Sequence, residues 1–152
     1  GGAMDQTFTQ HLAQVRAQRA ELGESMRALE DALALPLGLA VWGRRVRAAL
    51  TEVAHDVGEH VALTECDGGL YADLAAAAPR LASGIEAQLA DHAWLVAEVE
   101  RLLQARDDGI SRADLGAHRD EVTALLQRLV KHRQRGSDLI YEAYEVDIGG
   151  SG

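Results

Sequence analysis

The chain has 152 residues, of which 47% are hydrophobic and 26% are charged, and its formal net charge at pH 7 is -9. This length and composition suit one globular domain, and 15 basic residues set against 24 acidic ones argue against a surface for nucleic acids or anionic membranes. The low aromatic content of 4% and the two prolines are typical of long helices rather than of a sheet.

The single cysteine, Cys66, excludes an internal disulfide and is typical of a reducing compartment, so we expect a cytoplasmic protein. The sequence has no long apolar run and no signal peptide, which predicts that it does not cross a membrane. We interpret residues 1–4 as an expression scar and the start of the chain. Residues 5–146 are expected to form a single domain, followed by a flexible Gly-rich tail at 147–152.

A first helix is predicted at residues 5–35. It begins near Asp5 or Thr7 and ends before Pro36. His11 lies three residues after Phe8 and four before Val15, which places it on the apolar stripe near the helix start.

A second helix is predicted at residues 39–65. His60 lies three residues after Val57, which places it on the core face and close to the helix end. The Asp-Gly-Gly run at 67–69 is typical of a turn, and a short helix at 70–78 is expected after it.

A third helix is predicted at 79–105, with Pro79 in its first turn. Its apolar stripe is expected to contain Leu89, His92 and Val96. A fourth helix is predicted from Ser111, as N-cap, to 144–146, with His118 and His132 on its apolar face.

Short connections join antiparallel neighbours, so the predicted fold is an all-α, antiparallel up-down-up-down four-helix bundle. In that order the start of the first helix, the end of the second, the start of the third and the end of the fourth meet at one end. The histidines expected there are His11, His60, His92 and His132. His118 lies 14 residues from His132, roughly 20 Å along a helix, and belongs to the other end.

Four buried imidazoles at the same height along the bundle axis predict a metal site. One histidine on an apolar face is usually a hydrogen-bonded core residue, but four together leave several unmet hydrogen bonds, each costing about 1–3 kcal/mol. Metal coordination removes that cost, and imidazole is a common ligand for iron, zinc and copper.

The stretches from Glu59 to Glu65 and from Ala90 to Leu95 carry this pattern, which resembles the hemerythrin-like family of HHE cation-binding domains over roughly residues 8 to 145. The resemblance implies an up-down-up-down bundle with a di-iron site that binds oxygen or nitric oxide, in sensing, storage or redox protection. The expected cofactor is therefore iron, di-iron or mononuclear, with zinc as a replacement in a recombinant sample. The expected partners are this metal ion and a diatomic gas.

The family places bridging carboxylates four residues after the histidines of the second and fourth helices, where this chain has Thr64 and Gly136. The substitutes chosen here are Glu65, five residues after His60, and Asp138, six residues after His132. Tyr71 and Tyr141 are further candidates, as phenolate ligands.

Two other functions stay open at this point. The first is a degenerate, metal-free bundle that acts as an interaction module or binds a small ligand. The second is a metal-dependent oxidase or peroxidase-like enzyme, but no further residue supports it, so an enzyme is not the preferred hypothesis. The chain is expected to be a monomer or a homodimer, with Trp42 and Trp94, both placed off the main stripes, as a candidate partner surface.

Overall fold

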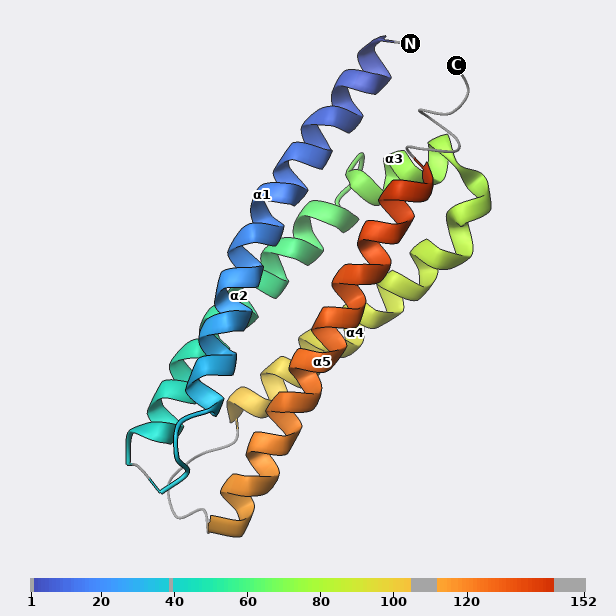
Figure 1. Cartoon of the computed structure of the whole chain (residues 1–152). Helices are drawn as coiled ribbons and strands as arrows, with labels where there is room; N and C mark the ends of the chain where they lie inside the picture. The colour runs from blue at the N-terminus through green and yellow to red at the C-terminus, as the bar shows by residue number, and fades with distance from the viewer. Residues whose placement is uncertain (1, 39, 105–111, 144–152) are drawn as a thin grey trace.

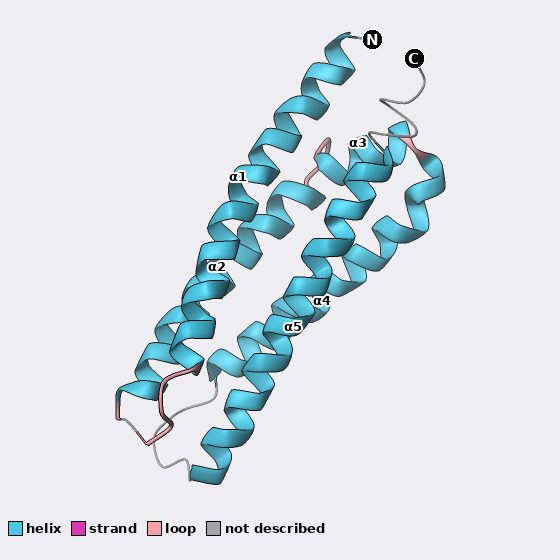
Figure 2. Cartoon of the chain, in the orientation of Figure 1, coloured by secondary structure: helices cyan, strands magenta, loops and turns pink. Residues whose placement is uncertain are grey.

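The computed structural model describes residues 2–38, 40–104 and 112–143. Within these ranges the chain forms helices and no strand (Figure 2), which confirms the all-α prediction. The elements are α1 (Gly2–Leu33), α2 (Val41–Glu65), α3 (Leu70–Ala77), the 3₁₀ helix η1 (Pro79–Leu81), α4 (Ala82–Gln104) and α5 (Arg112–Glu142). No described helix combines the length and the apolar character that a membrane span needs.

The four long helices form a bundle in which α2 packs against both α1 and α4, and α4 packs against α5 (Figure 1). The contact between α1 and α5 is slight by comparison. Figure 1 shows the first residues of α1, the short helix α3 and the last turns of α5 at one end of the molecule, and the link between α1 and α2 at the other.

Most helix boundaries follow the local signals. The helix α1 ends at Leu33, three residues before Pro36, which lacks the N–H that a continuing helix needs. A turn at 66–69 ends α2, and Gly68 adopts φ 71°, a conformation that favours glycine. Two details differ from prediction: α1 already begins at Gly2, and a 3₁₀ turn at Pro79 precedes α4. Ser111 and the predicted extension to 144–146 lie outside the described residues.

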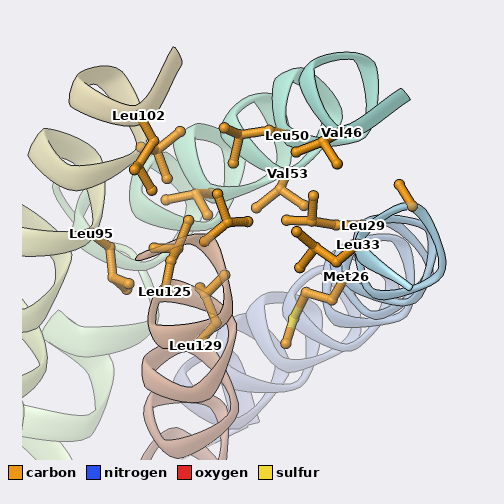
Figure 3. Close-up of a cluster of buried hydrophobic side chains, with 14 of the residues drawn as sticks. Met26, Leu29, Leu33, Val46, Leu50, Val53, Leu95, Leu102, Leu125 and Leu129 are labelled. Carbon is orange, nitrogen blue, oxygen red and sulfur yellow. The ribbon is translucent and has the colours of Figure 1, made fainter. Parts of the chain in front are cut away.

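Two apolar clusters make up the core. The larger one joins all four long helices, and Figure 3 shows its side chains from α1, α2, α4 and α5 pointing toward one another, among them Leu29, Val53, Leu95 and Leu125. The smaller one lies at the α3 end, and its buried members are Phe8, Val15, Leu70, Tyr71, Leu74, Ala78, Leu81, Ile85, Leu139 and Ala143. The helices α4 and α5 therefore pass from one cluster to the other between Ile85 and Leu95 and between Leu129 and Leu139.

The buried face of α4 is rotated from the predicted stripe. Leu89 and Val96 are 37% and 36% exposed, whereas Leu95 and Asp91 are 1% and 3% exposed. Leu89 and Val96 predict the wrong face, because on a helix rich in alanine several faces have similar hydrophobicity.

The two tryptophans also differ from each other. Trp42 is buried in the large cluster, so its predicted place off the apolar stripe is wrong. Trp94 is 38% exposed, and the guanidinium carbon of Arg128 lies 4.7 Å from the centre of its ring. This cation–π contact gives the exposed ring a partner within the same chain.

We expect Leu125→Ala to lower the free energy of unfolding by about 2–5 kcal/mol, because it removes buried methyl groups and leaves a cavity in the large cluster. Leu125 is 0% exposed, while Val130 on the same helix is 57% exposed. Val130→Ala is therefore the matched control, with a change within about 0.5 kcal/mol. Urea titration followed by circular dichroism measures both, and equal losses in the two variants would contradict this account of the core.

Candidate metal centre

Three histidines meet where the helices pass between the two apolar clusters. The side chains of His60 on α2, His92 on α4 and His132 on α5 bring one ligand atom each within 4.8 Å of the others. The Nε2 atom of His132 lies 2.9 Å from Nε2 of His92 and 3.2 Å from Nε2 of His60. Three of the four histidines predicted to converge are thus found together.

These separations suit ligands of a single metal ion. Two imidazole nitrogens bound at about 2.0–2.1 Å would lie about 3.3 Å apart at a tetrahedral angle and about 2.9 Å apart at a right angle. Three histidines with ligand atoms this close can hold a metal ion, and geometry alone does not select which one.

A carboxylate contacts the opposite ring nitrogen of two of these histidines. Nδ1 of His92 lies 2.7 Å from Oε2 of Glu65, and Nδ1 of His132 lies 2.7 Å from Oδ2 of Asp91. The other oxygen of Asp91 accepts a hydrogen bond of 2.6 Å from Nε of Arg128. Such carboxylate partners orient metal-bound histidines and make them more basic.

The two carboxylates also determine which ring nitrogen of His92 and of His132 carries the proton. A carboxylate only accepts, so Nδ1 of His92 and of His132 must each carry the ring proton. In a neutral imidazole the other nitrogen then holds a lone pair, and the two Nε2 lone pairs face each other across 2.9 Å. Two facing acceptors repel, and a cation between them removes the repulsion.

A proton is a poor candidate for that cation. Burial, with the charge of His92 and of His132, lowers the pKa of His60 to about 3. Burial and the charge of His92 lower the pKa of His132 to about 4, although Asp91 opposes this shift. Burial also lowers the pKa of His92 against the opposing effect of Glu65. All three shifts favour the neutral imidazole at pH 7, which is the form that binds metals.

His60 differs from the other two. Its Nδ1 is buried without a hydrogen-bond partner among the described residues. The positive charges of Arg19 and Arg133, rather than a carboxylate, act on this ring and contribute to its lowered pKa.

Tyr71 of α3 covers the site from the small cluster. Its ring stacks on His92, with centroids 5.7 Å apart and an interplanar angle of 13°. Burial raises the pKa of Tyr71 to about 12, so its phenol is neutral at pH 7 in the metal-free protein.

His11 lies outside the group of three. Its Nδ1 contacts a carboxylate oxygen of Asp73 on α3. Asp73 is an acidic residue in the first turn of α3, where negative charge is favourable. The interaction of His11 therefore joins α1 to α3 rather than to the histidine cluster.

The side chains that the sequence offered as oxygen ligands lie at different places in the structure. Glu65 reaches the site, but at Nδ1 of His92 rather than among the Nε2 atoms. Asp138 is exposed, and its Oδ1 accepts a hydrogen bond of 3.0 Å from Gln134. Tyr141 is 65% exposed and lies in a surface groove.

Thr64 and Gly136 are packed, rather than open, positions. Thr64 is 1% exposed, and its hydroxyl donates to the carbonyl of His60 at 2.8 Å. At Gly136 an added Cβ would meet Nε2 of Gln88 at 3.3 Å. That amide donates to the carbonyl of His132 at 3.1 Å, so Gln88 occupies the space that a longer side chain at 136 would need.

Sequence reasoning missed Asp91, Arg128 and Gln88. Asp91 directly precedes His92, and the predicted stripe of α4 placed it outside the core. Helical spacings of four and seven residues from the buried Leu95 lead to Asp91 and Gln88, so a stripe through Leu95 in place of Val96 contains both. Arg128 stands four residues before His132 and therefore on the same face of α5.

No protein-family model matches this chain, and neither a curated protein nor a solved structure matches it. The site is therefore supported by its geometry, and the family resemblance of the sequence remains an expectation.

We expect the metal-free protein to lose stability between pH 7.5 and pH 5, because unfolded histidines with the usual pKa of 6.5 bind protons there that the folded cluster does not. The unfolded state then binds more protons, so the free energy of unfolding falls as the pH falls, on the order of 2 kcal/mol for His60. Urea midpoints measured with a chelator present test this.

His60→Gln should show a shallower pH dependence than the parent protein. The exposed His55, which lies 3.6 Å from Glu59, gives the control, and His55→Gln should retain the parent slope. Parallel slopes in all three proteins would argue against neutral, buried imidazoles in the folded cluster.

Proposed function

We propose that this chain is a hemerythrin-like metal-binding protein with one iron ion held by His60, His92 and His132. The observation that carries the proposal is the 2.9 Å approach of Nε2 of His92 to Nε2 of His132, with a carboxylate oxygen at Nδ1 of each ring. A buried arrangement of this kind favours a cation between the two nitrogens, and the lowered pKa values of both rings favour a metal ion over a proton at pH 7.

The family assignment has separate support. The helices are few and long, α1 and α2 are linked at one end of the bundle, and α3 lies at the other (Figure 1). This suits an antiparallel up-down-up-down order, in which inward side chains of facing helices build metal sites. Iron is proposed from the resemblance of the sequence, since imidazole ligands also suit zinc, copper and nickel.

A mononuclear centre fits these residues better than a di-iron centre. Glu65 and Asp91 are hydrogen-bonded to Nδ1 atoms, so they orient the rings and are not free to bridge two metal ions. His11 is hydrogen-bonded to Asp73. Three protein ligands leave coordination positions open on iron, and a diatomic gas such as oxygen or nitric oxide is the ligand that we propose for them. The corresponding roles are gas sensing and redox protection.

Anaerobic reconstitution with ferrous iron, desalting and elemental analysis test this proposal. We expect about one iron per chain in the parent protein and at least a tenfold lower content in His60→Ala and His132→Ala. His55→Ala is the matched control, since His55 is exposed and lies on the same helix as His60. Less than a tenth of an iron in the parent, with no rise in melting temperature on adding ferrous or zinc ions, would favour the metal-free bundle instead.

We expect Asp91→Asn to weaken metal binding about 10- to 100-fold, because it removes the negative charge that holds the proton on Nδ1 of His132. Competition with a chromophoric chelator measures the affinity. Glu86→Gln is the control, since Glu86 is an exposed carboxylate on the same helix. Equal affinities of the two variants would show that Asp91 is only a structural partner of Arg128.

A further inference from the structure

Two arginines connect α1 and α5 next to the histidine cluster. Nη1 of Arg19 donates to the carbonyl of Arg133 at 2.9 Å, and Nη2 of Arg133 donates to the carbonyl of Arg19 at 3.2 Å. Gly23, one turn further along α1, makes room for this pair, because a Cβ there would lie 3.2 Å from Nη2 of Arg133. The two guanidinium groups are therefore held close together in fixed positions.

Neither guanidinium forms an ion pair with any residue in the described ranges. Both are partly buried, and Nε of Arg133 is buried without a hydrogen-bond partner. Burial lowers the pKa of both arginines, and for Arg133 the charges of Arg19 and Arg27 add to the effect. In a chain of net charge -9, a partly buried pair of cations without a carboxylate is a locally unfavourable arrangement that an anion would relieve.

A groove opens beside Arg19 on the same α1–α5 seam. It has a volume of about 500 Å³, and Leu12, Val15 and Ile140 supply its apolar wall. Arg16 and Arg19 provide positive charge along it, and Ser137 adds a hydroxyl. The slight contact between α1 and α5 leaves this space unfilled by side chains of the described residues.

We propose that this groove binds a small organic anion, a monocarboxylate with an apolar chain. The carboxylate lies on Arg19, with Arg16 adding positive charge, and the chain lies against Leu12, Val15 and Ile140. A guanidinium matches a carboxylate with two parallel hydrogen bonds, and the apolar wall distinguishes this ligand from inorganic phosphate. The site is separate from the proposed metal centre and needs no metal.

Isothermal titration of the metal-free protein with octanoate, 1-octanol and inorganic phosphate, in the presence of a chelator, tests the proposal. We expect octanoate to bind at least tenfold more tightly than either of the other probes. Arg19→Gln, which keeps an amide donor for the carbonyl of Arg133, should weaken octanoate binding at least tenfold. Arg45→Gln, at an exposed position of α2, is the control and should bind like the parent.

Arg16→Gln and Ile140→Ala keep the test decisive if Arg19→Gln does not fold. Arg16 is exposed and Ile140 is half-buried, so these variants should fold and each weaken octanoate binding about threefold or more. Equal binding of octanoate and 1-octanol would overturn the proposal, as would no binding of octanoate, or parent-like affinity in Arg16→Gln and Ile140→Ala. Because every titration uses metal-free protein, a failure of the proposed iron centre leaves this result unaffected.

Discussion

The 2.9 Å approach of Nε2 of His92 to Nε2 of His132 is the constraint on which the site depends. Each ring is turned into this position by a carboxylate on its other nitrogen, and the two carboxylates come from different helices. Glu65 of α2 holds the ring on α4, and Asp91 of α4 holds the ring on α5. The polar contacts therefore tie α2, α4 and α5 into one arrangement, and a shift of any one helix would move a ring away from its neighbours.

The apolar clusters on either side make such a position possible. A buried imidazole pair with facing lone pairs lowers the free energy of unfolding. The packing of the large cluster in Figure 3 offsets this cost and keeps the helices together. Tyr71, stacked on His92, closes the site toward the small cluster. Polar residues at the boundary of two apolar clusters fix the relative register of the helices, because sliding one helix would bury a ring without its carboxylate.

Much of this could be read from the sequence, and the failures have physical causes. The helices and the inward positions of His60, His92 and His132 follow from a period of 3.6 residues. Asp91 was missed because periodicity on α4 was satisfied almost as well by Leu89 and Val96, which the structure exposes. The place of His11 depends on where the short helix α3 packs, and no pattern within α1 encodes the position of Asp73.

The three imidazole rings differ in the basicity of their Nε2 atoms, because different charged groups act on each ring. Hydrogen bonds to Glu65 and Asp91 increase the basicity of Nε2 in His92 and His132. His60 has no such partner, and the field of Arg19 and Arg133 reduces its basicity. An ion at this centre would therefore be held most strongly from α4 and α5, with His60 as its weakest nitrogen donor.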